Sequence, residues 1–128
     1  MKLNEIIADT NNHVVGLCAG RHDLPVSEFI YSDVPDVLDF DGIQRVADAY
    51  VAKTCKPHSV YGCAVNSWDD TSIIIGDDLH VVVTGLTACT AAVITACACN
   101  GVNLTLWHFD RNSGDYVPQA FRFNVGHM

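Results

Sequence analysis

The sequence predicts a single α/β domain over residues 1–128, with a small mixed sheet, a Rossmann-like βαβ unit and two main helices. Residues 79–83 (LHVVV) form an apolar and β-branched run without alternation, which is typical of a central strand covered on both faces. A segment of helix length follows, and then a second apolar strand, so the two strands can pair in parallel. The length of 128 residues suits one domain with its own core.

The βαβ unit has recognisable boundaries. Residues 84–85 (Thr-Gly) break the first strand, and Thr87 is expected to cap a helix over residues 88–99. Gly101 ends that helix, and the second strand runs over residues 102–109. Ligands in such units sit beyond the carboxyl ends of the strands, so a site is expected at that edge.

The rest of the chain is expected to support this unit. The other expected elements are strands at 13–18, 28–31, 60–65, 72–75 and 116–123 and an amphipathic helix at 42–54. The strands at 60–65 and 72–75 form a predicted hairpin. The last strand alternates in hydrophobicity and contains Pro118, which favours an edge position.

The composition limits the partners. A net charge of −8 and a pI near 4.8 argue against binding to duplex or other nucleic acid through phosphate neutralisation, but leave room for a small anionic ligand held by local donors. Hydrophobic residues make up 49% of the chain, which favours a homo-oligomer. No apolar run approaches the ~20 residues that cross a bilayer, and no signal-peptide core is evident, so we expect no membrane partner and a cytoplasmic location.

The six cysteines are not expected to form a metal site. They form no CxxC pair and no zinc-ribbon spacing, and Cys97 and Cys99 point in different directions on a helix. Free cysteine is commonly buried, so we interpret these residues as core filler in a reducing compartment.

The expected helix N-terminus offers an anion site. Its first amides lie above Thr84 and Gly85, where the glycine keeps side chains away, and Thr87 stands beside them. Neither GK[ST] nor GxGxxG is present, which disfavours ordinary ATP or NAD binding. A phosphate group is the expected guest.

The end of the following strand carries a second set of candidates. His108 and Asp110 fall on one side of the strand, where they can hold a divalent cation or move a proton as catalytic residues, and Arg111 can neutralise a phosphate. The alternative is that Asp110, with Asn112 and Gly114, only builds a hairpin turn.

Three further features have two readings each. Arg21 and His22, with Asp23, follow the strand at 13–18, and form either a ligand-binding loop or an exposed charged turn. Trp68 is either a stacking platform for a base or a hydrophobic plug, and Trp107 is a second candidate for stacking a base. The aspartates of residues 33–41 lack the glycine and the closing glutamate of a calcium loop, so loop and helix-cap roles are preferred.

The stretch VVVTGLTACTAAVITACACNGVNLTLWHFDRNSGDYVPQ, at about residues 79–119, resembles the short CRISPR-associated ring nucleases of the third type. The shared pattern is a strand ending in Ser/Thr-Gly, a helix of small residues, a strand ending in aromatic-Asp, and a final strand ending in Gln. The resemblance implies a small α/β protein that associates and cleaves cyclic oligoadenylates, often with manganese. It further implies that Thr84 and Gly85 line the ligand and that Asp110 stands at the family's aspartate.

The chain departs from that pattern at positions where the family's side chains are expected to bind phosphate. Asn112 and Leu86 stand where the family has arginines, and Arg111 occupies a proline position. Three hypotheses follow. The first is a metal-assisted phosphodiesterase acting on a cyclic oligonucleotide second messenger, the second a sponge that captures such a messenger without cleaving it, and the third a protein-interaction module.

Overall fold

The structure is a computed structural model, and it describes residues 2–9, 12–20, 23–55 and 78–123. The elements in chain order are α1 (Leu3–Ala8), β1 (His13–Cys18), β2 (Phe29–Tyr31), α2 (Phe40–Thr54), β3 (Asp78–Val82), α3 (Thr87–Asn100), β4 (Asn103–Asp110) and β5 (Asp115–Phe121). The expected strands at 60–65 and 72–75 and Trp68 lie outside the described residues.

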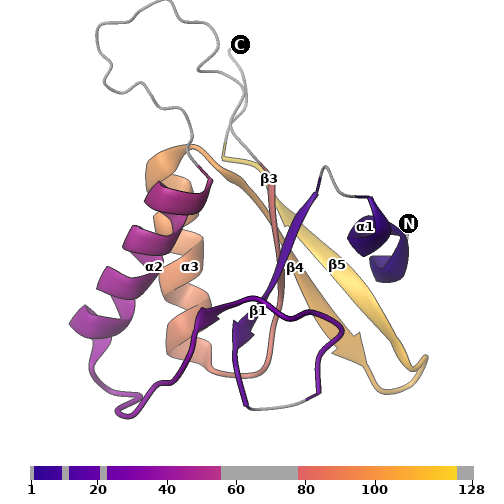
Figure 1. Cartoon of the computed structure of the whole chain (residues 1–128), viewed down its shortest axis with the longest axis horizontal. Coiled ribbons are helices and arrows are strands. Elements are labelled where there is room, and N and C mark those ends of the chain that lie inside the picture. Colours follow the sequence, from indigo (N-terminus) through magenta and orange to yellow (C-terminus); the bar gives the residue numbers. More distant parts are fainter. Residues whose placement is uncertain (1, 10–11, 21–22, 56–77, 124–128) are drawn as a thin grey trace, which may run out of the picture.

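The strands form one five-stranded mixed sheet in the order β2-β1-β3-β4-β5 (Figure 1). β1 pairs in parallel with β2 and with β3, β3 pairs in parallel with β4, and β5 is antiparallel to β4. β3 is therefore the middle strand, because β1 and β4 cover both of its edges. The predicted single α/β fold with a parallel βαβ unit is confirmed.

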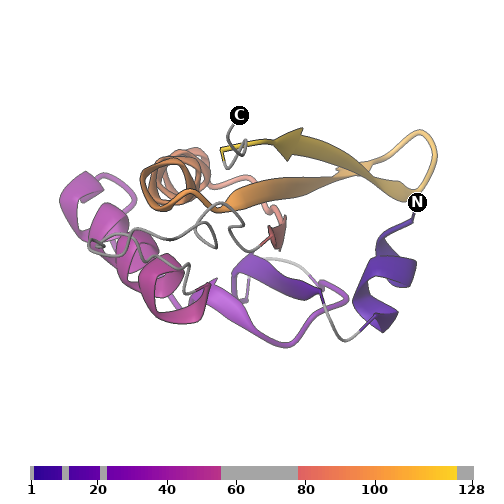
Figure 2. The ribbon, with the colours of Figure 1, turned by 90° about the horizontal axis from the view of Figure 1, so that it is seen from above.

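The two long helices cover one face of the sheet and build the main core. Strand side chains that point to this face alternate along the chain, as the period of two requires, and they include Val15, Leu17, Leu79, Val81, Leu104 and Leu106. α2 contributes Ile43, Ala47 and Val51 to this core. Figure 2 shows α2 and α3 together on one side of the sheet, with α1 on the other.

The helices α2 and α3 pack closely because α3 is made of small residues. Ala92, Val93, Ala96 and Cys97 are buried, and the side-chain nitrogen of Gln44 in α2 donates to the carbonyl of Ala92 at 3.0 Å. Burial raises the pKa of the Cys97 thiol to about 12, so this cysteine is unreactive core filler, as predicted. Of the five described cysteines only Cys99 is exposed.

A second, smaller core lies on the opposite face. Leu3 and Ile6 of α1 pack there against Val82 and Trp107, with Leu24 and Val26 from the segment after β1 at its margin. The helix α1 was not predicted, since the sequence shows only a short apolar patch in a turn-like context. Its six residues are too few for a stable isolated helix, so packing against the sheet holds it.

Most predicted boundaries agree with the structure. β1 has the predicted ends, and α2 starts two residues earlier than predicted, because Asp39 caps it by accepting from the amide of Gly42 at 3.1 Å. Gly101 ends α3 in the left-handed region, and the edge position of β5 is confirmed. In the described part of the chain, no helix is long and apolar enough to cross a bilayer.

Candidate functional site

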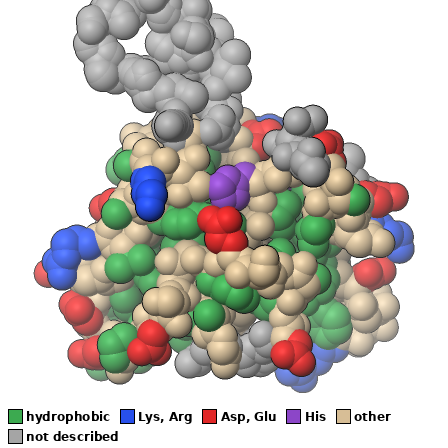
Figure 3. All heavy atoms as spheres, viewed as in Figure 1, with side chains coloured by type: hydrophobic (Ala, Val, Ile, Leu, Met, Phe, Trp, Pro, Cys, Tyr) green, Lys and Arg blue, Asp and Glu red, His purple; other side chains and the backbone are tan. Residues whose placement is uncertain are grey.

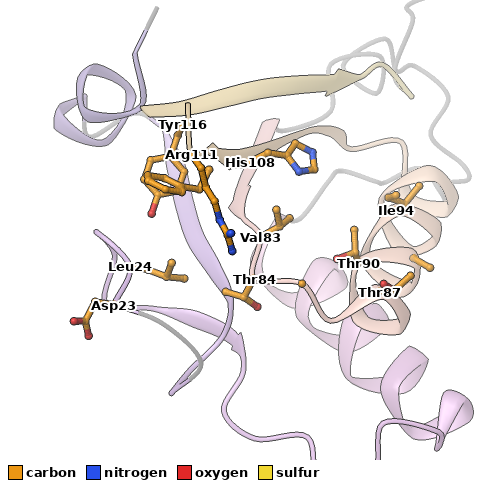
Figure 4. Close-up of a pocket in the computed structure, with 13 residues that line it drawn as sticks. Asp23, Leu24, Val83, Thr84, Thr87, Thr90, Ile94, His108, Arg111 and Tyr116 are labelled. Atoms are coloured by element: carbon orange, nitrogen blue, oxygen red, sulfur yellow. The ribbon is translucent and has the colours of Figure 1, made fainter. Parts of the chain in front are cut away.

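The carboxyl ends of β1, β3 and β4 meet at one edge of the sheet, because the three strands are parallel. A cavity of about 890 Å³ opens there (Figure 4). Its walls come from the segments after β1 and β3, from β4, β5 and the turn between them, and from one face of α3. The lining residues are Asp23, Leu24, Val83, Thr84, Gly85, Thr87, Thr90, Ala91, Ile94, His108, Phe109, Arg111 and Tyr116. The site expected at this edge is therefore a real hollow, of a size that suits a small molecule.

Thr84 places an unsatisfied hydroxyl at this cavity. Its oxygen is buried and has no hydrogen-bond partner among the described residues. A buried hydroxyl without a partner costs roughly 1–3 kcal/mol, so such a group is usually explained by a water or a ligand. Gly85 follows with φ of +99°, a conformation that a side chain would strain, and this bend turns the chain into α3.

The N-terminus of α3 is open toward the same space. The N-cap residue is Leu86, and no side chain caps it within the described parts of the chain. The prediction that Thr87 caps this helix is wrong, because Thr87 already lies in the first turn and is exposed. The helix therefore presents its first amides and its positive dipole end without a side chain over them.

One face of α3 forms the cavity wall. Thr87, Thr90, Ala91 and Ile94 all line it, and their spacing of three, four and seven positions is that of one helix face. The hydroxyl of Thr90 donates back to the carbonyl of Leu86 at 3.2 Å, so it leaves a small, mostly apolar surface beside the amides.

Arg111 and His108 supply the polar groups opposite α3. The Arg111 side chain extends from the β4–β5 turn toward Val83 and Thr84 (Figure 4). Neither ion pair found among the described residues involves Arg111, so its charge is free to meet an anion. The Nε2 atom of His108 lies 2.8 Å from Oε1 of Gln119 in β5. In the neutral tautomer that donates from Nε2 to this oxygen, the lone pair is on Nδ1.

Asp110 is not part of the cavity wall. Its carboxylate accepts from the amide of Asn112 at 3.1 Å, and its carbonyl accepts from the amide of Gly114 at 2.8 Å. Gly114 has φ of +74°, as the turn before β5 requires. These contacts are those of a hairpin turn, which the sequence offered as the alternative to a catalytic role for Asp110.

An aromatic pair, Phe109 and Tyr116, forms the part of the cavity wall that lies away from α3. The rings of Phe109 and Tyr116 meet edge to face, with centroids 5.3 Å apart, and both residues line the cavity beside Leu24 and Asp23. Phe109 is 54% exposed. An exposed ring at a cavity rim is a surface on which a planar group can stack.

His108 and Asp110 are the two residues that the sequence predicts as manganese ligands. His108 and Asp110 contribute two donors, and no group of three or more His, Cys, Asp or Glu side chains is found in the described ranges. Each of the two is also engaged in the hydrogen bond given above.

The sequence predicted some of the residues that line this cavity. Thr84, Gly85, Thr87, Arg111 and His108 come together as expected, whereas Arg21 and His22 lie outside the described residues. Trp107 is 2% exposed and bonded to His80, so it does not stack a ligand. The apolar and aromatic wall was missed: Leu24, Val83, Thr90, Ala91, Ile94, Phe109 and Tyr116. Only the helical spacing of the α3 residues could have indicated part of it.

The fold and the cavity define a single-domain α/β protein with a cavity at the carboxyl edge of its parallel strands. No protein-family model, no curated protein and no solved structure matches the chain.

Proposed function

We propose that the protein binds a cyclic oligonucleotide second messenger in the cavity at the carboxyl edge of β3 and β4. The observation that carries the proposal is the buried hydroxyl of Thr84 without a partner among the described residues, in a residue that lines the same cavity as Arg111 and the start of α3. A phosphate oxygen accepts hydrogen bonds from the hydroxyl, the helix amides and the guanidinium alike. A neutral apolar ligand would leave these donors unpaired.

The rest of the wall fits the rest of a nucleotide. Phe109 and Tyr116 offer a stacking surface at one end, and Ala91 and Ile94 offer an apolar surface at the other. Phosphate donors lie between the two ends (Figure 4). This order of an apolar surface, phosphate-binding donors and a second apolar surface suits a ligand in which a phosphodiester joins two nucleosides.

Cleavage of the ligand is the more demanding version of the proposal. Nδ1 of His108 would accept the proton of a ribose 2′-hydroxyl, the 2′-oxygen would attack the phosphorus, and the 5′-oxygen would leave with a proton from solvent. Arg111 would stabilise the charge that develops on the phosphate oxygens. The catalytic assignment of Asp110 gains no support from its position in the turn.

Capture without cleavage is the second candidate. It is favoured by the turn role of Asp110 and by the lack of a three-donor metal group in the described ranges. Either version would serve in the cytoplasm to counter or tune a nucleotide-signalled antiviral defence, which is the setting that the ring-nuclease resemblance implies. The exposed ring of Phe109 at the rim also suits a homo-oligomer in which a second subunit covers the ligand.

The test is to incubate the protein with cyclic di-, tri- and tetranucleotides, with and without manganese, and to chromatograph each mixture before and after heating. Linear products would establish cleavage, and loss of free ligand that returns intact on heating would establish capture. Arg111→Gln is the informative variant and Arg45→Gln, on α2 away from the cavity, is its matched control. Unchanged ligand throughout the panel would refute the proposal.

A further inference from the structure

A second groove, which shares no lining residue with the cavity, lies beside the start of α2. It has a volume of about 440 Å³. One wall is the loop before α2, the other is the exposed side of the first turns of that helix, and its lining residues are Tyr31, Asp33, Val34, Pro35, Asp36, Asp39, Gly42, Ile43, Arg45, Val46 and Ala49. Gly42, Val46 and Ala49 follow one another at helical spacing, so the groove runs along α2.

Large apolar side chains are exposed in the stretch of chain that forms this groove, and of the four named next Val46 lines the groove itself. Leu38 is 71% exposed, Phe40 60%, Val37 47% and Val46 43%. They are four of the six large hydrophobic side chains that are exposed in the described part of the chain, and they fall within ten consecutive positions. Such a concentration is typical of a surface that a partner covers.

The loop before α2, which displays Val37 and Leu38, is held by hydrogen bonds. The amide of Leu38 donates to the Asp36 carboxylate at 2.9 Å, and the amide of Asp39 donates to the carbonyl of Asp36 at 3.1 Å. Asp39 in turn caps α2. Leu38 therefore projects from an ordered turn and Phe40 from the first turn of α2, so a partner would not have to order the loop before contacting them.

The charge around the groove selects the partner. Residues 33–46 contain four aspartates (33, 36, 39 and 41) and one arginine (45), a net charge of −3. Figure 3 shows carboxylates and hydrophobic side chains interleaved over the loop before α2, at the lower left. A second copy of the chain would bring the same negative charges to the interface, whereas a basic segment would meet opposite charges.

We propose that this groove binds a basic amphipathic helix from a partner protein. The apolar side of that helix would cover Leu38, Phe40 and Val46, and its lysines or arginines would face the surrounding aspartates. A groove that runs along one helix is the surface into which an amphipathic helix packs. The carboxylates then steer association, and the apolar contacts hold the complex.

The probe is a synthetic helical peptide with leucines on one face and lysines on the other, and binding to the full chain is followed by fluorescence anisotropy. Replacing Leu38 and Phe40 together by serine should weaken binding about tenfold or more, because central apolar anchors carry most interface energy. The matched control replaces Phe109 and Val117 by serine, which removes two exposed apolar residues elsewhere. This control should bind the peptide like the wild type.

Two results would overturn the inference. One is equal affinity of the Leu38/Phe40 variant and the wild type for the peptide, with circular dichroism showing that both are folded. The other is a wild-type dimer in analytical ultracentrifugation that Leu38→Ser dissociates, since the groove would then bind a second copy. Neither Leu38 nor Phe40 lines the cavity, so nucleotide binding by the Leu38/Phe40 variant tests the proposed function separately.

Discussion

The indole nitrogen of Trp107 donates a hydrogen bond to Nδ1 of His80 at 3.1 Å, joining β4 to β3 on the face that α1 covers. The two rings lie 6.2 Å apart between centroids. Because Nδ1 accepts this bond, His80 is neutral in the folded protein and carries its proton on Nε2. Trp107 thus serves the architecture of the sheet, and its polar atom is satisfied inside the second core.

This contact predicts a dependence of stability on pH. Burial lowers the pKa of His80 below its ordinary value of 6.5, although the nearby charge of Asp78 opposes the shift. The unfolded chain then binds a proton at a higher pH than the folded chain, so this contribution is complete above about pH 6.5 and is lost as the pH falls toward the lowered pKa. His80→Gln keeps an acceptor for the indole and should flatten the decline.

Urea unfolding midpoints over a series of pH values check this prediction. His108→Gln is the matched control, because His108 is exposed and its loss should leave the decline in place. A His80→Gln variant whose stability falls with acid as steeply as that of the wild type would contradict the assignment to His80.

Thr84→Val should separate stability from binding. Valine has nearly the shape of threonine, and it removes a buried hydroxyl that has no partner among the described residues. We expect the free energy of unfolding of the ligand-free protein to rise by about 1 kcal/mol. Nucleotide binding should weaken at the same time, because a phosphate donor is lost. Thermal unfolding and calorimetric titration measure the two effects, and a less stable variant would show that the hydroxyl already has a partner.

Gly16→Ala should destabilise the packing of β1 against β2. A Cβ atom at this position would lie 2.5 Å from the Phe29 ring and 3.1 Å from the Leu24 side chain. Overpacking of this kind costs roughly 1–3 kcal/mol. Combining it with Phe29→Leu should recover part of the loss, as a double-mutant cycle from urea unfolding would show. Additive losses would mean that the ring does not limit this position.

Gly101→Ala should cost about 1 kcal/mol of folding free energy, because Gly101 ends α3 with φ of +66°. A Cβ atom there would meet nothing within 4 Å, so the loss is conformational and not steric. Asparagine tolerates this backbone region better than alanine, so Gly101→Asn should lose less. Chemical unfolding of the two variants gives the order, and equal losses would argue against a backbone origin.

Substitution of Asp110 distinguishes its two readings. Asp110→Asn keeps an acceptor for the amide of Asn112, whereas Asp110→Ala removes it and should cost roughly 0.5–1.5 kcal/mol. If the protein cleaves its ligand and Asp110 only builds the turn, the Asp110→Asn variant should cleave at the wild-type rate. A loss of about 100-fold or more in that variant, measured in single-turnover assays, would instead make the carboxylate an acid–base catalyst.

The sequence predicted those helices and strands whose limits are set by residues close together in the chain. The apolar run of β3, the small-residue helix α3 and Gly101 behind it place the βαβ unit to within about two residues. The edge position of β5 follows from Pro118, which has no amide to donate into a ladder. Each of these signals acts through the backbone of its own segment. It can therefore be recognised in the sequence without knowledge of the tertiary structure.

Contacts between distant segments could not be predicted in this way. The short helix α1 depends on Val82 and Trp107, which are about 80 and 100 positions away along the chain. The wall of Phe109 and Tyr116 depends on the pairing of β4 with β5, which brings the two rings together. Asp110 had two readings in the sequence, and the turn contacts favour the structural one.

The sequence by itself determined the fold class, the parallel βαβ unit and the edge of the sheet where a ligand is expected. Periodicity and the backbone preferences of glycine and proline are local properties, and they are sufficient for this. The tertiary structure alone decided which side chains share the cavity, that Thr84 lacks a partner among the described residues, and that Leu38 and Phe40 are exposed near the start of α2. Burial and hydrogen-bond satisfaction are sums over neighbours from the whole chain, so they exist only once the chain has folded.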